Sequence, residues 1–232
     1  MAAPAFRSST TSYTGSGATS VTPTEPAGAA DGDIIVSFIY IENLNPASIT
    51  PPTGWSDTFN GVSLQRDMTL SGRVFSFQAF WIRRGASAPS YSSFSWSGSS
   101  GVQHLTAAYS GAVASGDPWS FHADANRDTA ASSAYPTVSG TTLTADERVI
   151  WAGGTIDGTS GFTGPTGHTS RYSPDGSDVV LTDVAQATAG SVSASGADWG
   201  GTAGNAAVVL LGLQSVAAAT NPTPATVAAS AT

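Results

Sequence analysis

The chain has 232 residues, no cysteine and a formal net charge of −8. Only 10% of its residues are charged, compared with roughly 25% in an ordinary globular domain. The lack of cysteine excludes disulfides, thiolate metal sites and cysteine nucleophiles. All eight basic residues are arginine and form no basic run, so no nucleic-acid partner is expected, because displacing counterions from phosphates requires a stripe of cationic side chains.

No stretch approaches the 18 or so consecutive apolar residues of a membrane-spanning helix. The first ten residues lack a basic segment followed by an apolar one, so no signal peptide is predicted. We therefore expect a protein made in a cytoplasm, with no membrane partner.

Runs of β-branched and aromatic residues alternate along the chain with clusters of Gly, Pro, Asp and Ser, a pattern typical of short strands. The clearest strand is predicted at 33–42 (DIIVSFIYIE). Both of its faces are apolar, which indicates a central strand covered on each side. Other strong strands are predicted at 73–83, 91–96, 102–109, 148–152 and 205–213, with a turn at 97–101, and weaker ones at 5–13, 167–172, 178–184 and 191–195. This pattern predicts an all-β fold, an antiparallel β-sandwich or jelly roll, as a single domain over residues 1–214.

A weak internal repeat runs through this domain. Ala-Asp-Gly-Asp at 30–33 precedes an apolar strand, and Pro-Thr-Gly-Trp follows at 52–55. Ala-Asp-Glu-Arg at 145–148 and Pro-Thr-Gly-His at 165–168 have a similar arrangement. Two halves of similar plan would explain the repeat, but so would the Pro-x-Gly turns that any protein built of strands and turns uses.

The tail at 215–232 is rich in Ala, Thr and Pro and carries no charge. Such a segment does not bury enough apolar surface to order itself. Asn221–Pro222 and Thr223–Pro224 favour extended backbone. We expect an arm that adds contacts to another subunit or to a capsid.

The residues that might carry chemistry are scattered. His104, His122 and His168 lack the close spacing of metal ligands. Asp31 and Asp33 fit a turn better than a carboxylate pair for glycoside hydrolysis or Ca²⁺ binding. The acidic segments 124–128 and 175–178 do not follow the calcium-loop pattern, and the Ser16 segment is one residue short of a nucleophile elbow. No catalytic residue, metal or cofactor is therefore expected.

Five of the six tryptophans divide into two groups, and the sixth, Trp96, ends a predicted strand. Trp81 and Trp151 lie inside apolar segments and are predicted to be core residues. Trp55, Trp119 and Trp199 lie in turn-rich segments. They are candidates for contact with a glycan or a partner, or else plugs over the end of the core.

Several of these segments have a familiar combination of turns: Gly32–Asp33 before a strand, Pro-Pro-Thr-Gly-Trp at 51–55, Ala86 and Pro89 after a strand, and Tyr109-Ser-Gly111. Across residues 26–112, with a weaker match to 213, the chain resembles β-sandwich structural proteins of tailed bacteriophages of high-GC hosts. The resemblance implies a virion protein without catalytic residues, most simply a capsid decoration or minor capsid protein. It implies contacts with its own copies and with phage capsid or tail proteins.

Two alternative functions remain open for a chain of this kind. The chain is a tail or fibre component, or it is a glycan-binding or adhesin module with cell-surface glycans as partners. A glycan-cleaving enzyme is the least favoured reading, because no carboxylate pair stands in a convincing context.

Overall fold

The computed structural model describes residues 2–42, 48–70, 73–89, 91–127, 132–156, 158–202 and 204–216, with the backbone alone at 65–70, 73, 74 and 99. Asp128 and residues 217–232, which include most of the expected arm, lie outside the described residues. Every element in the described part of the chain is a strand or a turn, and all strand pairs are antiparallel. The predicted all-β class is confirmed. No helix in the described segments has the length and apolarity to cross a membrane.

The first half of the chain forms a five-stranded sheet with the order β1-β7-β2-β6-β5. The predicted central strand, β2, does lie in the middle of this sheet. The bounds are β1 Ala5–Val21, β2 Ile34–Glu42, β5 Gln65–Leu70, β6 Arg73–Arg83 and β7 Phe94–Ser110. A short hairpin, β3 Thr58–Phe59 and β4 Val62–Ser63, precedes β5.

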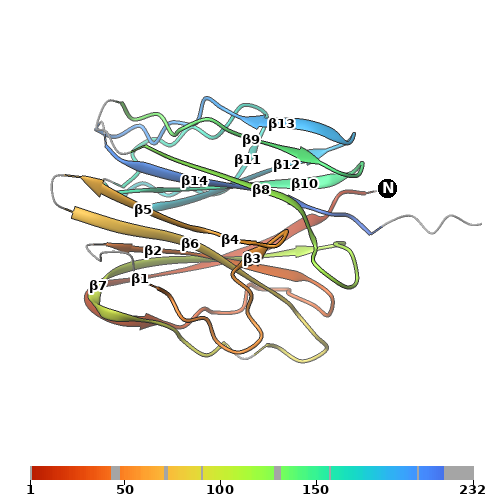
Figure 1. Ribbon diagram of the computed structural model, residues 1–232, viewed down its shortest axis with the longest axis horizontal. Helices are drawn as coiled ribbons and strands as arrows, with labels where there is room; N and C mark the ends of the chain where they lie inside the picture. The colour runs from red at the N-terminus through yellow and green to blue at the C-terminus, as the bar shows by residue number, and fades with distance from the viewer. Residues whose placement is uncertain are drawn as a thin grey trace, which may run out of the picture.

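The second half forms another five-stranded sheet, with the order β11-β12-β10-β14-β8. A two-stranded ribbon of β9 and β13 lies on its outer side (Figure 1). The bounds are β8 Trp119–Arg127, β9 Val138–Thr142, β10 Glu147–Thr155, β11 Thr169–Tyr172, β12 Val179–Gln186, β13 Gly190–Ala194 and β14 Ala206–Leu213. Each sheet therefore takes its strands from one half of the chain, without the exchange of strands between sheets that defines a jelly roll.

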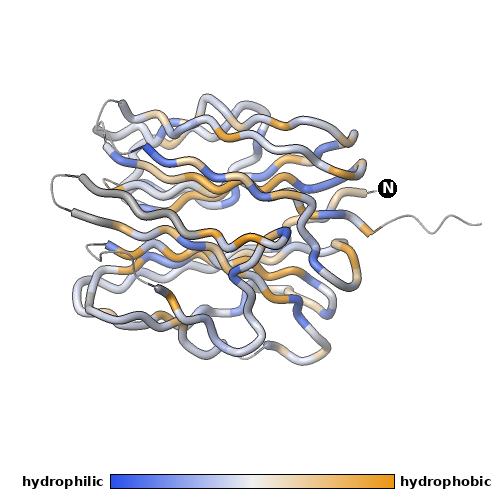
Figure 2. Tube along the Cα trace, viewed as in Figure 1, coloured by the Kyte–Doolittle hydropathy of each residue, from blue (hydrophilic) through white to orange (hydrophobic). Residues whose placement is uncertain are grey.

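The two sheets pack face to face (Figure 1), and hydrophobic positions recur along the strands of both (Figure 2). The core between them takes side chains from both sheets. In β2 every second residue points into this core, namely Ile34, Val36, Phe38 and Tyr40. Alternate residues of β10, β12 and β14 close it from the other side. This burial of apolar side chains is the main stabilising term of the fold.

The outer face of each central strand is buried as well. Ile35 and Ile39 of β2 lie under a second cluster that includes Val21 at the end of β1 and Ile49 and Trp55 from a connecting segment. Val149 and Trp151 of β10 lie under a third cluster to which β9 and β13 contribute. Covering on both faces explains why these strands are apolar throughout instead of alternating.

The two sheets have the same topology. If the five sheet strands of each half are labelled a to e in chain order, both sheets read a-e-b-d-c from one edge to the other. Strands β1, β2, β5, β6 and β7 thus correspond to β8, β10, β11, β12 and β14. The repeat in the sequence therefore reflects two halves of the same plan, and not only a shared use of Pro-x-Gly turns.

The correspondence extends to individual turns. Gly32 and Asp146 precede the second strand of each half and both have left-handed backbone, with φ of 83° and 59°. When the two halves are aligned in this way, Asp33 is equivalent to Glu147. The sequence repeat instead pairs Asp33 with Arg148, one residue further on. The Pro-Thr-Gly turns at 52–55 and 165–168 also correspond, because in each the residue after glycine donates its N–H to the proline carbonyl, at 3.2 and 3.0 Å.

Strand prediction failed in specific places. The expected strands 91–96 and 102–109 are one strand, β7, which continues through the expected turn at 97–101. Along this part of β7 the register with β1 shifts twice, between Thr14 and Ala18 and between Ala18 and Ser20, so irregularities in both strands keep them paired. Strands β3, β4, β5, β8 and β9 were not predicted, because they are short or polar.

Candidate functional site

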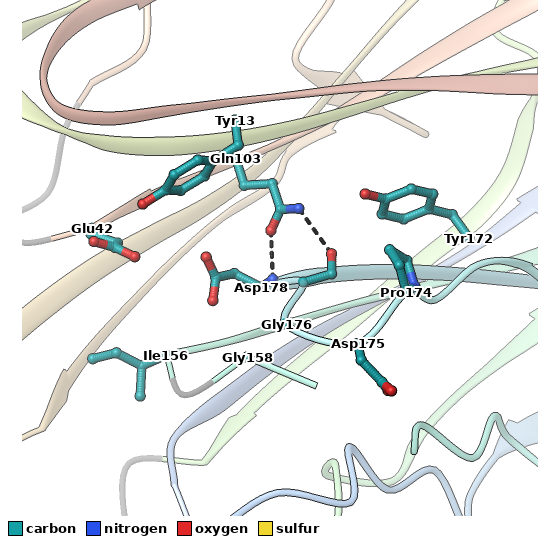
Figure 3. A pocket seen from close by; sticks show the side chains of 11 residues that line it. Tyr13, Glu42, Gln103, Ile156, Gly158, Tyr172, Pro174, Asp175, Gly176 and Asp178 are labelled. Atoms are coloured by element: carbon teal, nitrogen blue, oxygen red, sulfur yellow. Dashed lines mark hydrogen bonds between the residues drawn. The ribbon is translucent and has the colours of Figure 1, made fainter. Parts of the chain in front are cut away.

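A groove of about 550 Å³ opens at one edge of the molecule, where the two sheets separate (Figure 3). The first sheet contributes Tyr13 of β1, Glu42 of β2 and Gln103 of β7. The second half contributes Tyr172 of β11, Ile156, Gly158 and the turn at 174–178 between β11 and β12. The groove therefore combines residues from both halves of the chain.

Gln103 fixes the turn that forms the floor of the groove (Figure 3). Its side-chain N–H donates to Ser177 Oγ at 2.9 Å, and its carbonyl accepts the N–H of Asp178 at 2.5 Å and of Val179 at 3.1 Å. Gln103 and Ser177 are both buried, at 6% and 3% exposure. Three hydrogen bonds in a buried setting hold the turn against the first sheet before any ligand is present.

Three carboxylates line the groove. Within the described part of the chain Glu42 makes no hydrogen bond or ion pair, and its carboxylate lies against the backbone of Gly101. A Cβ at Gly101 would stand 2.9 Å from Glu42 Oε2. Asp175 accepts the N–H of Gly161 through one oxygen, at 2.8 Å. Among the described lining residues there is no Arg or His, so the site is acidic.

Two tyrosines flank these carboxylates. Tyr13 is 63% exposed, the second most exposed large hydrophobic residue in the described part of the chain. Tyr172 is half-buried and packs against the central core. Figure 3 shows both hydroxyls directed along the groove, with Gln103 between them.

The three tryptophans singled out as contact candidates lie elsewhere. Trp55, Trp119 and Trp199 are only 7%, 1% and 0% exposed. Trp55 packs edge-on against Phe94, Trp119 packs against Phe59, and Trp199 packs against Tyr135. Their indole faces are not open to solvent, so the expectation of stacking on a glycan does not fit their burial, and each acts as a plug in an apolar cluster. Of the two predicted core tryptophans, Trp151 is fully buried and Trp81 only partly.

The histidines stay apart from one another. His104 is buried between β1 and β2, with its ring nitrogens against Ser12 at 3.3 Å and against Thr106. Burial lowers its pKa from 6.5 to about 4. His168 contacts Thr182 at 3.0 Å beside a second cavity of about 260 Å³ under β13, and burial lowers its pKa to about 4 as well. His122 lies in β8, away from both.

The acidic candidates have separate placements. Asp31 is exposed, whereas Asp33 is buried and paired with Arg7. Asp33 also accepts the N–H of Ala30 at 2.8 Å, the kind of backbone contact that the turn interpretation expects. Asp175 and Asp178 do come together, in the groove. Within the described ranges, no three His, Asp or Glu side chains are arranged to hold a metal ion.

One buried charged cluster joins the two sheets. Asp183 of β12 is fully buried and accepts two hydrogen bonds from Arg171, at 2.8 and 2.9 Å, one from Arg148 at 3.2 Å and one from the Tyr109 hydroxyl at 3.2 Å. Burial first, and then Asp183, raise the pKa of Tyr109 well above its ordinary value. With all partners satisfied, this cluster has a structural role.

Four lining residues were not predicted from the sequence to be members of a site, namely Tyr13, Glu42, Gln103 and Tyr172. Gln103 carried a usable signal, because a glutamine inside an apolar strand requires a buried hydrogen-bond partner. The others are ordinary polar residues of strands, and no spacing connects them. No protein-family model, no curated protein and no solved structure matches this chain.

Proposed function

We propose that the chain is a structural protein of a tailed-bacteriophage particle, a capsid decoration or minor capsid protein that makes assembly contacts. The resemblance of residues 26–112 to such proteins motivates the proposal. A tail or fibre position is the alternative version, and it places the same demand on the surface, namely a face that pairs with neighbouring subunits.

The observation that carries the proposal is the edge strand β1. It is 17 residues long and terminates its sheet, with β7 on one side only. Between Arg7 and Glu25 it has no charged residue, and residues 13–17 are exposed. Natural proteins usually protect a long edge with lysine, proline or a short strand, because its unpaired N–H and C=O groups recruit other chains.

The segment at 24–27 covers only part of this edge. Ser8 donates to the carbonyl of Ala27 and Thr10 to that of Thr24, both at 2.7 Å. The stretch from Thr11 to Gly17 has no such cover from that segment. A strand of this kind is suited to pairing with a strand of a neighbouring subunit.

The experiment places one charge on the edge. Thr14→Lys changes an exposed residue of β1, and Thr53→Lys makes the same change in an exposed turn of the same half. Self-association is measured by sedimentation, and incorporation by mass spectrometry of particles from cultures that express each variant.

We expect the parent and Thr53→Lys to associate and to be incorporated, and Thr14→Lys to lose both properties. The proposal fails if the parent is absent from particles. It fails also if Thr14→Lys is incorporated as fully as the control, since the edge would then make no assembly contact.

A further inference from the structure

We infer that the groove formed by Tyr13, Glu42, Gln103, Tyr172 and the turn at 174–178 is a binding site for a short neutral glycan. This inference goes beyond an assembly role and does not depend on it. It rests on the shape, the charge and the preorganisation of the groove.

The groove has the size of a ligand site. Its volume of about 550 Å³ lies within the range of roughly 300–1,000 Å³ that small-molecule sites occupy. It is open to solvent and not enclosed, which suits a chain of sugar rings that enters and leaves better than a ligand enclosed on every side.

The lining matches the two-sided chemistry of a sugar ring. A pyranose has an apolar C–H face and a rim of hydroxyls. Tyr13 and Tyr172 offer ring faces together with hydroxyls, and Ile156 and Pro174 add apolar surface. Glu42 and Asp175 offer carboxylate oxygens that accept O–H donors in short, strong hydrogen bonds.

The charge of the groove selects among glycans. Three carboxylates line it without a cationic residue among the described lining positions. Among the described lining residues, no cationic side chain would offset the repulsion that a uronic acid, a sialic acid or a phosphate meets there. Neutral sugars carry only hydroxyl and amide donors, which these acceptors satisfy.

The site is formed before a ligand binds. The three hydrogen bonds of Gln103 hold the 174–178 turn, and Gly101 leaves room for the Glu42 carboxylate. A ligand therefore does not have to order these groups, which removes a large part of the cost of binding.

The test is titration calorimetry of the full chain with neutral oligosaccharides built from glucose, mannose, galactose or N-acetylglucosamine, beside polygalacturonate and a lysine-rich peptide. Tyr13→Ala and Glu42→Gln alter the groove. Leu143→Ala is the matched control, because Leu143 is also exposed, at 64%, and lies at the opposite end of β10 from Ile156. Unfolding midpoints verify that all variants are folded.

We expect at least one neutral oligosaccharide to bind, with affinity reduced about tenfold or more by each groove variant and unchanged by Leu143→Ala. The inference is overturned if no neutral oligosaccharide binds, or if the groove variants bind as well as the parent. Binding of the lysine peptide alone, lost in Glu42→Gln, would identify a cation site instead. Glu42-dependent release of reducing ends would show a catalytic site and overturn simple binding.

Discussion

Asp33 and Glu147 occupy the same position in the two halves of the chain, and each anchors the start of its central strand. Asp33 accepts the N–H of Ala30 at 2.8 Å, and Glu147 accepts the N–H of Thr144 at 2.7 Å, in both cases three residues earlier. Each also binds the residue at the bulge of the first strand of its half: Arg7 donates to Asp33, and Ser120 donates to Glu147.

Although Asp33 and Glu147 share a position, we expect their replacement to lower the free energy of unfolding by different amounts. Glu147 is fully buried and also accepts hydrogen bonds from Leu143 N–H and Thr144 Oγ1. Glu147→Ala should lower the free energy of unfolding by about 2 kcal/mol or more, because several donors lose a buried acceptor. Asp33→Ala should cost less, since the Arg7 side chain is 37% exposed and water replaces its partner. Urea unfolding of both variants measures the order, and the reverse order would contradict this account.

Phe121 lies between two glycines that leave space for its ring. A Cβ at Gly140 would stand 2.1 Å from the ring, and one at Gly212 would stand 2.4 Å from it. Gly140→Ala and Gly212→Ala should each destabilise the fold by about 1–3 kcal/mol through overpacking, and Phe121→Leu should relieve part of that loss. Gly15→Ala is the control, because no atom lies within 4 Å of its Cβ position. The double variants combine Phe121→Leu with either glycine substitution. If the losses of stability simply add in them, the Phe121 ring is not the cause of the destabilisation.

Of the two tryptophans in apolar strands, Trp151 should contribute more to stability than Trp81. It is fully buried and contacts Tyr135 edge-on at 5.0 Å between ring centroids. Trp151→Ala is expected to cost about 3–5 kcal/mol, measured by denaturant unfolding. Trp81→Ala should cost less, because Trp81 is only partly buried, and the lost hydrogen bond from its indole N–H to the Thr58 carbonyl offsets only part of that difference. Equal midpoints for Trp151→Ala and the parent would refute the packing of the third cluster.

His104 should make stability depend on pH. Burial lowers its folded-state pKa from 6.5 to about 4, so the unfolded chain binds more protons between these values. The stability that the neutral, buried His104 side chain contributes is therefore complete above pH 6.5 and is lost as pH falls from about 6.5 to about 4. The full shift corresponds to roughly 3 kcal/mol.

The comparison that isolates this effect is His104→Gln against the parent. Between pH 6.5 and 5, above the ordinary range of carboxylates, the fall in unfolding free energy should be smaller in the variant. NMR titration of the imidazole gives the pKa directly. A value near 6.5 would mean that the side chain is not buried in solution.

Truncation after Val216 should leave the fold intact. The three apolar clusters end at Leu213, and Val216 N–H still donates to the Gly111 carbonyl at 3.1 Å. We expect an unchanged melting temperature together with reduced occupancy on particles, if residues 217–232 form an arm. Full occupancy by the truncated chain, measured by quantitative mass spectrometry, would exclude the arm.

The sequence by itself determined the all-β class, the most apolar strands and the repeated Pro-Thr-Gly segments. Strands such as 33–42 and 73–83 were predictable because β-branched and aromatic residues form continuous apolar runs between glycine and proline clusters, and this signal is local. The turn before β2 was also predictable, since aspartate and glycine at 30–33 favour turn conformations.

Only the tertiary structure decided which strands pair, which tryptophans are covered, and where the groove lies. Pairing depends on contacts between residues far apart in the chain, so the glycine-rich centre of β7 continues as strand opposite the bend of β1. Trp55 and Trp199 are buried because distant segments fold over them. The groove joins Tyr13 to Asp178, and no local pattern marks residues that meet only where two sheets separate.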